Sequence, residues 1–351
     1  MRVGLDATPL TVATGGVTRY LVELRRALEA AFPEDYYQFL SDQPVPRRPD
    51  WPTPWTTPPP GRFASKWWLL GLPVTLRRQR LDVFHGTDFS VPYLRACPSV
   101  LSLHDLSPWR EAGWHCGADR VRRRTPWLLR LGRASMVLTL SEAVRREAIE
   151  RFSLRPERVV AVPLAAGTGF APRPRDPAVA PYFLYVGTLE PRKNLPFLVE
   201  AWRELWRRHR VPLVLAGRRR EDGPVFAAEE GLELRGAVAE ADLPALYANA
   251  LAVVYPSLYE GFGLPVLEAM QSGVPVLTSR DPAVTEVAGG AAWQGEADDS
   301  RAWVEAMAAC VTQPERLAAC RAAGLKRAET FSWERTARET HAVYEEAVRR
   351  G

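Results

Sequence analysis

Short apolar segments alternate with longer amphipathic ones along almost the whole chain of 351 residues. The apolar segments have the length of buried strands, and the segments between them have the length and periodicity of helices. This alternation is typical of parallel α/β sheets, because parallel strands have to be joined by a crossover, usually a helix. In the first half we predict strands over 2–7, 82–86, 99–105, 136–141 and 159–164, and helices over 18–32 and 141–152, the latter capped by Ser141.

The length of the chain suggests two domains of roughly 150 to 200 residues, since it is too long for one ordinary core. The alternation halts at residues 171–181, whose prolines cannot continue a helix or a central strand. It resumes with predicted strands over 182–188, 211–217, 232–236 and 251–256, and with helices over 195–209 and around 242–250. We expect two doubly wound domains, over 1–172 and 173–335, that bind a ligand at the carboxyl ends of their strands and in the cleft between them.

Composition favours a globular protein of a reducing compartment. Hydrophobic residues make up 46% and charged residues 25% of the chain, and no stretch approaches the roughly 18 uncharged apolar residues of a membrane span. The N-terminal segment lacks the apolar core of a signal peptide. No two of the four cysteines (Cys97, Cys116, Cys310, Cys320) form a CxxC pair, so neither a zinc site nor a disulfide framework is indicated. We expect a cytoplasmic protein.

The net charge of +5 is distributed unevenly. Residues 1–176 hold 26 Lys and Arg against 17 Asp and Glu, or +9, and the remainder holds 20 against 24, or −4. A basic first half and an acidic second half indicate a different partner for each. Nucleic acid is not favoured as a partner, because the sequence has no zinc-finger spacing, aromatic RNA-binding strand or basic repeat.

A glycine-rich turn between two glutamates carries the strongest chemical signal. Residues 255–276 read YPSLYEGFGLPVLEAMQSGVPV, in which Glu260 and Glu268 flank the GFG turn that leaves a buried strand. Pro265 suits the first position of the following helix, which would place Glu268 in its first turn. Free amides at a helix start bind phosphate, whereas carboxylates bind hydroxyls, and the combination describes a nucleotide sugar. The alternative is a turn that carries surface acids, with Glu268 stabilised by the helix dipole.

Two further strand ends hold candidate ligand-binding groups. GTLEPRKNL, at residues 187–195, places the adjacent cations Arg192 and Lys193 where a diphosphate would be neutralised. The alternative is a pair of solvated loop charges.

In the first domain, Gly15 and Gly16 precede a helix, and His104 follows a strand, where it can donate to a sugar or phosphate oxygen. The glycines form neither a Walker motif nor a full GxGxxG, and the histidine can equally be structural.

Together these segments resemble the retaining family 4 glycosyltransferases of the GT-B type, especially bacterial mannosyl- and rhamnosyltransferases. The matching segments, spread over nearly the whole chain, are GLDATPL, TGGVTRYLVEL, VLSLHDLSP, VLTLSEAVRREAI, YFLYVGTLEPRKNL, ALYANALAVVYPSLYEGFGLPVLEAMQSGVPVLTS and FSWERTA. The resemblance implies two Rossmann-like domains facing a central cleft, with a C-terminal helix over 336–351 that crosses back to the first domain. It also implies metal-independent transfer of a hexose from a nucleotide-diphosphate sugar, with no other cofactor.

The resemblance also implies a role for each matching residue. Glu268 would bind the ribose hydroxyls, and Glu260, with the turn formed by Phe262, Gly263 and Leu264, would hold the donor sugar and phosphate. Lys193 would neutralise the diphosphate, Gly15 and Gly16 would close on it from the first domain, and His104 would lie beside the anomeric centre. Many relatives have a second phosphate-binding arginine where this chain has Thr188, and Arg192 is its candidate replacement.

GDP-mannose is the donor that we expect, because Glu240 lies in a segment similar to the family's base-binding loop and can accept from guanine N1–H and N2–H. The alternative is that Glu240 caps the helix that starts near Asp242. The resemblance leaves open whether retention proceeds through an ion pair or a covalent intermediate. Two other readings are a different GT-B-fold enzyme, such as a nucleotide-sugar epimerase, and a non-catalytic sugar-nucleotide sensor.

The acceptor is expected to be a glycan or a lipid-linked glycan. Segments 65–80 and 119–133 mix tryptophan and leucine with arginines, a composition typical of helices that lie on an anionic membrane. The alternative is that both are helices packed on the sheet. Finally, we expect Lys193→Ala and Glu268→Ala to lower donor affinity with little loss of fold, since polar side chains at the ends of strands and helices contribute mainly ligand contacts.

Overall fold

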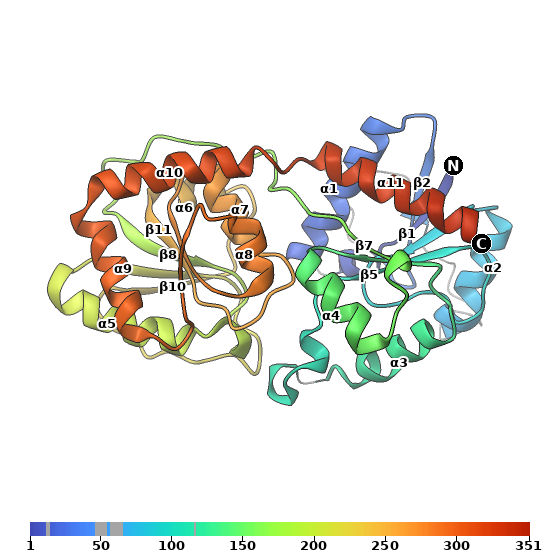
Figure 1. Ribbon diagram of the computed structural model, residues 1–351, viewed down its shortest axis with the longest axis horizontal. Coiled ribbons are helices and arrows are strands. Elements are labelled where there is room, and N and C mark those ends of the chain that lie inside the picture. Colours follow the sequence, from blue (N-terminus) through green and yellow to red (C-terminus); the bar gives the residue numbers. More distant parts are fainter. Residues whose placement is uncertain (12–14, 46–54, 57–65, 116) are drawn as a thin grey trace. The chain divides into compact units, whose positions relative to one another are not determined.

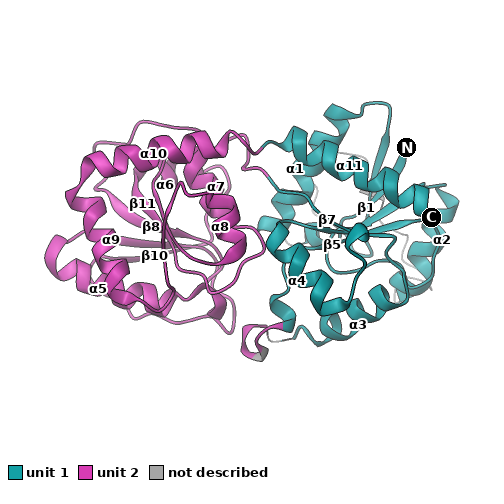
Figure 2. Ribbon diagram, viewed as in Figure 1, with its two compact units in different colours: residues 1–109, 117–164, 332–351 teal, residues 110–116, 165–331 magenta. Residues whose placement is uncertain are grey.

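The computed structural model describes residues 1–351 except 12–14, 46–54, 57–65 and 116. It divides into two compact units (Figure 2). Unit 1 comprises Met1–Trp109, Gly117–Leu164 and Ser332–Gly351, and unit 2 comprises Arg110–Cys116 and Ala165–Phe331. The division therefore falls at Ala165, a few residues before the proline-rich segment that we took as the boundary. The C-terminal segment belongs to unit 1.

Unit 1 is built on a parallel sheet of seven strands in the order β3-β2-β1-β4-β5-β6-β7 (Figure 1). Its strands are β1 (Arg2–Asp6), β2 (Tyr36–Leu40), β3 (Trp55–Thr56), β4 (Val83–Gly86), β5 (Ser99–Leu103), β6 (Met136–Thr139) and β7 (Val159–Ala161). Its helices are α1 (Gly16–Ala31), α2 (Leu72–Arg78), α3 (Asp119–Arg130), α4 (Glu142–Phe152) and α11 (Trp333–Arg350). Ser141 caps α4 by accepting from the amide of Val144 at 3.3 Å, as its sequence predicts.

Unit 2 repeats this architecture with a parallel sheet of six strands in the order β10-β9-β8-β11-β12-β13. Its strands are β8 (Tyr182–Val186), β9 (Leu213–Ala216), β10 (Leu232–Gly236), β11 (Ala250–Tyr255), β12 (Val276–Ser279) and β13 (Trp293–Gly295). Its helices are α5 (Leu195–His209), α6 (Leu243–Asn249), α7 (Leu264–Gln271), α8 (Pro282–Ala288), α9 (Ser300–Thr312) and α10 (Pro314–Ala328). The strand order reverses between β1 and β4 in unit 1 and between β8 and β11 in unit 2, which is the doubly wound arrangement expected.

The C-terminal helix α11 is fixed to unit 1 by polar contacts as well as by packing. It lies beside α1 (Figure 1), and its Tyr344 hydroxyl is 2.7 Å from Nδ1 of the fully buried His85 on β4. Thr336 at its start donates to the carbonyl of Pro163 at 2.7 Å. The contacts tie the last helix to the central strand of the sheet, so α11 is an integral part of unit 1.

Two neighbouring strands of the unit 1 sheet were not predicted from the sequence. The proline-dense stretch 44–60 lies mostly outside the described residues, but Trp55–Thr56 within it pairs in parallel with Phe39 and Leu40 of β2. A strand at this position is compatible with the neighbouring prolines because it is the edge of the sheet. The strand β2 itself, YYQFL, was not predicted, although its tyrosines and phenylalanine are typical of strands.

Most apolar side chains of the described part of segment 65–80 are buried. Trp67 and Trp68, in a π-helical turn, are 3% and 9% exposed. They pack with Leu72, Leu76 and Phe84 in one core cluster of unit 1. Burial on the sheet therefore accounts for both tryptophans and for Leu72 and Leu76, which favours the alternative of a helix packed on the sheet, while Leu69 is 38% exposed. Of the helices that the structure describes, none combines the length and the apolar character needed to cross a bilayer.

Candidate active site

The candidate site of unit 2 forms where the strand order of its sheet reverses. The strands β8 and β11 are parallel neighbours, and the chain leaves β8 toward β9 on one side and leaves β11 toward β12 on the other. The segments that follow them, residues 187–194 and 256–263, diverge at the carboxyl edge of the sheet. This point of divergence is where doubly wound folds bind ligands.

Lys193 and Glu260 meet at this edge as a buried ion pair. The Lys193 ammonium lies 2.5 Å from Oε1 of Glu260 and 3.2 Å from the hydroxyl of Tyr255, while Arg192 Nη1 lies 2.9 Å from Oε2 of Glu260. Lys193 and Glu260 are only 6% and 5% exposed. The structure thus brings together the two cations and the first glutamate of the sequence motif, from segments that lie more than sixty residues apart.

The electrostatic balance keeps Glu260 ionised. Burial would raise the pKa of its carboxyl, but the charges of Lys193 and Arg192 and the hydrogen bond from Lys193 outweigh this effect and lower the pKa to about 2. Burial and the nearby Arg192 charge lower the pKa of Lys193, and the carboxylates of Glu260 and Glu190 oppose that shift. An ionised Glu260 accepts hydrogen bonds and cannot donate one, which suits the binding of hydroxyl groups.

A second glutamate, Glu190, extends the cluster to the neighbouring strand β9. One oxygen of Glu190 lies 2.8 Å from Arg192 Nε, and the other accepts from Arg220 Nη1 at 2.5 Å. Arg220 follows β9 and also binds Asp222 at 2.5 Å. Carboxylates and guanidinium groups therefore alternate along the carboxyl edge from β11 to β9. Glu190 and Arg220 were not among the residues predicted from the sequence, although Glu190 directly precedes Pro191, Arg192 and Lys193.

The GFG turn leads into helix α7 with a glycine that requires its special conformation. Gly263 has φ 102° at the N-cap of α7, a left-handed region that L-residues avoid, and a Cβ there would lie 3.3 Å from Val284. The Phe262 side chain is 4% exposed and packs edge-on against Phe331, with ring centroids 5.9 Å apart. Phe262 therefore anchors the turn in the core, so that only backbone groups of the turn are available for a ligand.

Glu268 lies deeper than its sequence position suggested. Helix α7 begins at Leu264, so Pro265 is its second residue and Glu268 its fifth, not a residue of the first turn. The side chain of Glu268 is 1% exposed and accepts a hydrogen bond from the Tyr247 hydroxyl of α6 at 2.9 Å. The prediction that Glu268 lies in the first turn is wrong, because Gly263 already serves as the N-cap and the helix starts one residue earlier.

Asp281 supports the Glu260 turn from the next strand end. It follows β12, caps α8 by accepting from the amides of Ala283 and Val284 at 3.0 Å, and accepts from the Glu260 amide at 3.2 Å. Burial and the Glu260 charge raise the pKa of Asp281 to about 6, against its backbone hydrogen bonds. Sequence reasoning missed this residue, yet an aspartate before Pro282 is a recognisable helix start.

A short segment that follows the unit 1 strand β5 also packs at this edge. Residues 110–116 belong to unit 2. Trp114 stacks on Tyr259 at a centroid distance of 6.1 Å, and the Arg110 guanidinium lies 4.3 Å from the centre of the same ring. The carbonyl of Trp114 accepts a hydrogen bond from Arg220. Tyr259 directly precedes Glu260 in the sequence, so this aromatic contact lies next to the Glu260 turn. No sequence pattern indicated it.

The unit 1 candidates lie at the carboxyl edge of their own sheet. Gly15 has φ 138° and precedes α1, which begins at Gly16, and among the described residues, which exclude 12–14, nothing lies within 4 Å of a Cβ built on Gly15. His104 follows β5, is 8% exposed, and its Nε2 lies 2.5 Å from the carbonyl of Thr87. Its ring meets that of Tyr20 edge-on at 5.2 Å. These contacts hold His104 in place, as expected for a histidine with a structural role. It also lies at the carboxyl edge of the sheet, where doubly wound folds bind ligands.

Glu240 lies apart from the charged cluster, on the exposed turn that precedes α6. The N-cap of α6 is Asp242, so Glu240 stands two residues outside the helix and does not occupy the cap position. Its exposure leaves it accessible to a ligand.

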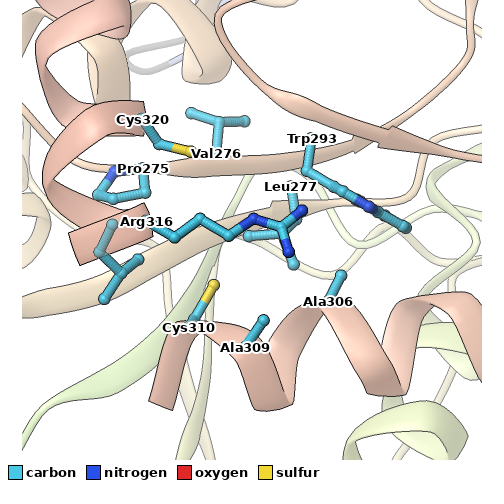
Figure 3. Close-up of a pocket in the computed structure, with 10 residues that line it drawn as sticks. Pro275, Val276, Leu277, Trp293, Ala306, Ala309, Cys310, Arg316 and Cys320 are labelled. Carbon is cyan, nitrogen blue, oxygen red and sulfur yellow. The ribbon is translucent and has the colours of Figure 1, made fainter. Parts of the chain in front are cut away.

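A small cavity elsewhere in unit 2 is not part of this site. Figure 3 shows it between α9, α10 and the start of β12, with the free thiols of Cys310 and Cys320 on its wall. Its volume of about 20 Å³ has room for a single water molecule. Burial raises the pKa of the Cys310 thiol to about 12. In the parts of the chain that the structure describes, no three His, Cys, Asp or Glu residues gather in a way that could hold a metal ion.

Known proteins resemble this chain in sequence and in fold. Residues 14–168 match the family described as Glycosyltransferase Family 4, and residues 180–313 match that described as Glycosyl transferases group 1. The chain is 36% identical to the O-antigen chain mannosyltransferase B of Escherichia coli, over 77% of this chain and 75% of that protein. It is 26% identical to the O-antigen chain mannosyltransferase RfbU of Salmonella typhimurium, over 70% and 69% of the two chains. Sucrose-phosphate synthase of Thermosynechococcus elongatus has the same fold, with a TM-score of 0.74 over 98% of both chains at 19% identity.

The burial of Lys193 changes the expectation that its replacement leaves the fold intact. We predict that Lys193→Met lowers the free energy of unfolding by about 3 kcal/mol, because it leaves the buried Glu260 carboxylate with Arg192 as its remaining cation. Urea unfolding at pH 7 measures this effect. Arg203→Met is the matched control, since Arg203 pairs with Glu229 nearer the surface, and we expect a loss of about 1 kcal/mol or less.

The pH dependence of this loss gives a second check. The lowered pKa of Glu260 stabilises the folded state above the unfolded-state pKa of about 4.3, and this contribution is lost as the pH falls toward about 2. The deficit of Lys193→Met relative to the wild type should therefore shrink between pH 5 and pH 3. A deficit that stays constant over this range, or is absent at pH 7, would contradict the ion pair.

Proposed function

This chain belongs to family 4 of the glycosyltransferases and has their GT-B fold, and we propose that it transfers mannose from GDP-mannose to a glycan acceptor with retention of the anomeric configuration and without a metal ion. The observation that carries the proposal is the cluster of Lys193, Arg192 and Glu260 at the switch point of the unit 2 sheet. It combines groups for a diphosphate with a group for sugar hydroxyls.

The cluster suits the charges that develop when the anomeric C–O bond breaks. The departing nucleoside diphosphate gains negative charge, which the ammonium of Lys193 and the guanidinium of Arg192 stabilise without rearrangement. The amides of Gly263 and Leu264 at the start of α7 can add donors for the same phosphate, whereas Pro265 has no N–H and the amides of Val266 and Leu267 donate to the Gly263 carbonyl. Two fixed cations can thus supply what a metal ion supplies in other transferases.

Glu260 has capacity for the donor sugar in addition to its two cations. Each carboxylate oxygen carries two lone pairs, and the described contacts place Lys193 on one oxygen and Arg192 on the other. The remaining lone pairs can accept from sugar hydroxyls, and the lowered pKa keeps the carboxylate in its accepting form. Glu268, buried beneath this turn, is assigned to the ribose hydroxyls, which requires the Tyr247 hydrogen bond to be shared or exchanged.

In unit 1 we assign Gly15 and Gly16 to the donor phosphate and His104 to the anomeric centre. The backbone at Gly15 is open, which allows a phosphate to approach the first amides of α1. His104 has one ring nitrogen against the Thr87 carbonyl, which leaves Nδ1 for a sugar or phosphate oxygen.

The acceptor that we propose is a glycan, either free or carried on a lipid at the inner face of the cell membrane. Two relatives are named O-antigen chain mannosyltransferases, and this supports both mannose as the donor sugar and a polysaccharide acceptor. Both segments considered for membrane docking have an exposed large apolar side chain, since Trp127 of α3 is 49% exposed and Leu69 is 38% exposed.

The proposed reaction is tested directly by donor turnover. With GDP-mannose and EDTA present we expect release of GDP and an α-linked mannosyl product when an oligomannose acceptor is supplied, observed by proton NMR of the anomeric signal. UDP-glucose, the control donor, should give less than about one tenth of this rate. A β-linked product would contradict retention, a requirement for Mg²⁺ would contradict the role of the cations, and conversion of the donor to an epimer would identify a different enzyme.

The choice of guanine as the base is tested at Glu240. We predict that GDP binds more tightly than UDP, and that Glu240→Gln weakens GDP binding by about tenfold while it changes UDP binding little, because a carboxylate accepts more strongly than an amide. Glu233→Gln, on the exposed edge strand β10, is the matched control. Calorimetric titration decides the question, and tighter binding of UDP to the wild type would exclude a GDP-linked donor.

A further inference from the structure

A large basic pocket lies on unit 1, between α3, α4 and the loop that leads from α4 to β7. It has a volume of about 630 Å³. Four arginines line it (Arg130, Arg151, Arg155 and Arg158), together with apolar groups such as Leu129 and Phe152. No acidic residue is among the described residues of its wall. A hollow with four cations and an apolar wall is suited to an anionic ligand with an organic body.

This pocket is separate from the candidate catalytic groups of the same unit. Gly132 and Ala134 in its wall directly precede β6, and residues 153–158 directly precede β7. The pocket therefore lies at the amino-terminal edge of the parallel sheet, whereas His104 and Gly16 lie at the carboxyl edge. A ligand in this pocket would not occupy the site proposed for the donor.

The helix dipoles explain only part of this concentration of charge. Arg130 and Arg151 lie in the last turns of α3 and α4, where cations stabilise a helix. Arg155 and Arg158 lie beyond the end of α4 and gain less from its dipole. Arg158 Nε is buried and has no hydrogen-bond partner in the described structure. A buried donor without a partner requires an explanation, and Arg158 is one of the residues that line the pocket.

The loop that carries Arg155 and Arg158 is fixed in place before any ligand binds. Ser153 ends α4 in the left-handed conformation, with φ 50°. Arg145, in the first turn of α4, donates to the carbonyl of Val159 at 2.6 Å and to that of Pro156 at 3.0 Å. A preformed cationic site loses little conformational entropy on binding, which favours recognition of a small anion.

We propose that this pocket binds a phosphoryl group carried on an organic body. Guanidinium groups bind phosphate oxygens in a bidentate manner, and the pocket is much larger than a phosphate ion. Trp127 and Leu131, which adjoin the wall residues Pro126 and Arg130 in the sequence, are 49% and 46% exposed. The phosphoryl group belongs either to the headgroup of a membrane lipid, which these apolar side chains favour, or to a soluble organic phosphate.

The test compares two double variants that each remove two positive charges from unit 1. Arg155→Gln/Arg158→Gln alters the pocket, and Arg146→Gln/Arg338→Gln is the matched control, because those side chains are 77% and 64% exposed and do not line the pocket. Flotation with phosphatidylglycerol or phosphatidylcholine vesicles reports the lipid source, and calorimetry with glycerol 3-phosphate reports the soluble source. We expect the pocket variant to lose about tenfold or more in affinity for at least one anionic probe, and the control variant less than about twofold.

Each outcome bears on the proposal. If the pocket variant loses binding only to phosphatidylglycerol vesicles, the lipid headgroup is supported. If it loses binding of glycerol 3-phosphate, the soluble phosphate is supported. Equal behaviour of the two double variants on both probes, or wild-type protein that binds neither, overturns the proposal. Thermal unfolding followed by circular dichroism verifies that the variants are folded, and Arg155→Gln alone, at an exposed position, serves if the double variant is not. None of these readouts depends on glycosyl transfer, so the outcome is independent of the proposed reaction.

Discussion

The buried ion pair between Lys193 and Glu260 is the interaction on which the organisation of unit 2 depends. It joins the segments that leave the neighbouring strands β8 and β11, at the place where those segments diverge. Burial of either charge alone would be costly. The pair is stable because Arg192 donates to the second oxygen of Glu260 and the Tyr255 hydroxyl accepts from Lys193. Asp281 also accepts from the Glu260 amide. The same contacts that hold the fold at this edge also fix the positions of the groups that we assign to the donor.

Preorganisation is the functional consequence of this arrangement. Cations that are already buried and oriented by carboxylates do not have to be desolvated or reoriented when a diphosphate arrives or when its charge increases during bond cleavage. Glu190 and Arg220 continue the alternation of charge toward β9, so that neighbouring groups of the cluster contact one another directly. Stability and ligand binding are therefore coupled at this edge, and substitutions there are expected to affect both.

Sequence patterns predicted the fold well where local periodicity decides it. The helix over 195–209 and the strand over 232–236 were predicted with the bounds that the structure has, and the α/β alternation predicted both sheets. The edge strand β3 could not be predicted, because a two-residue strand in a proline-dense segment has no pattern of its own. Trp67 and Trp68 illustrate a second limit, since the composition of a buried amphipathic helix and that of a membrane-surface helix are the same until the tertiary packing is known.

For the candidate site, the motifs identified Lys193, Arg192 and Glu260, but not the residues that join them to the rest of the unit. Glu190, Arg220 and Trp114 come from separate loops, and only the strand order brings them together.

The most direct test of the central claim is the affinity of GDP and of GMP for the wild type and for Arg192→Gln, measured by calorimetry. If the cluster binds the diphosphate, the substitution weakens the binding of GDP by about tenfold and the binding of GMP by less than about twofold. An equal effect on both nucleotides would contradict the account.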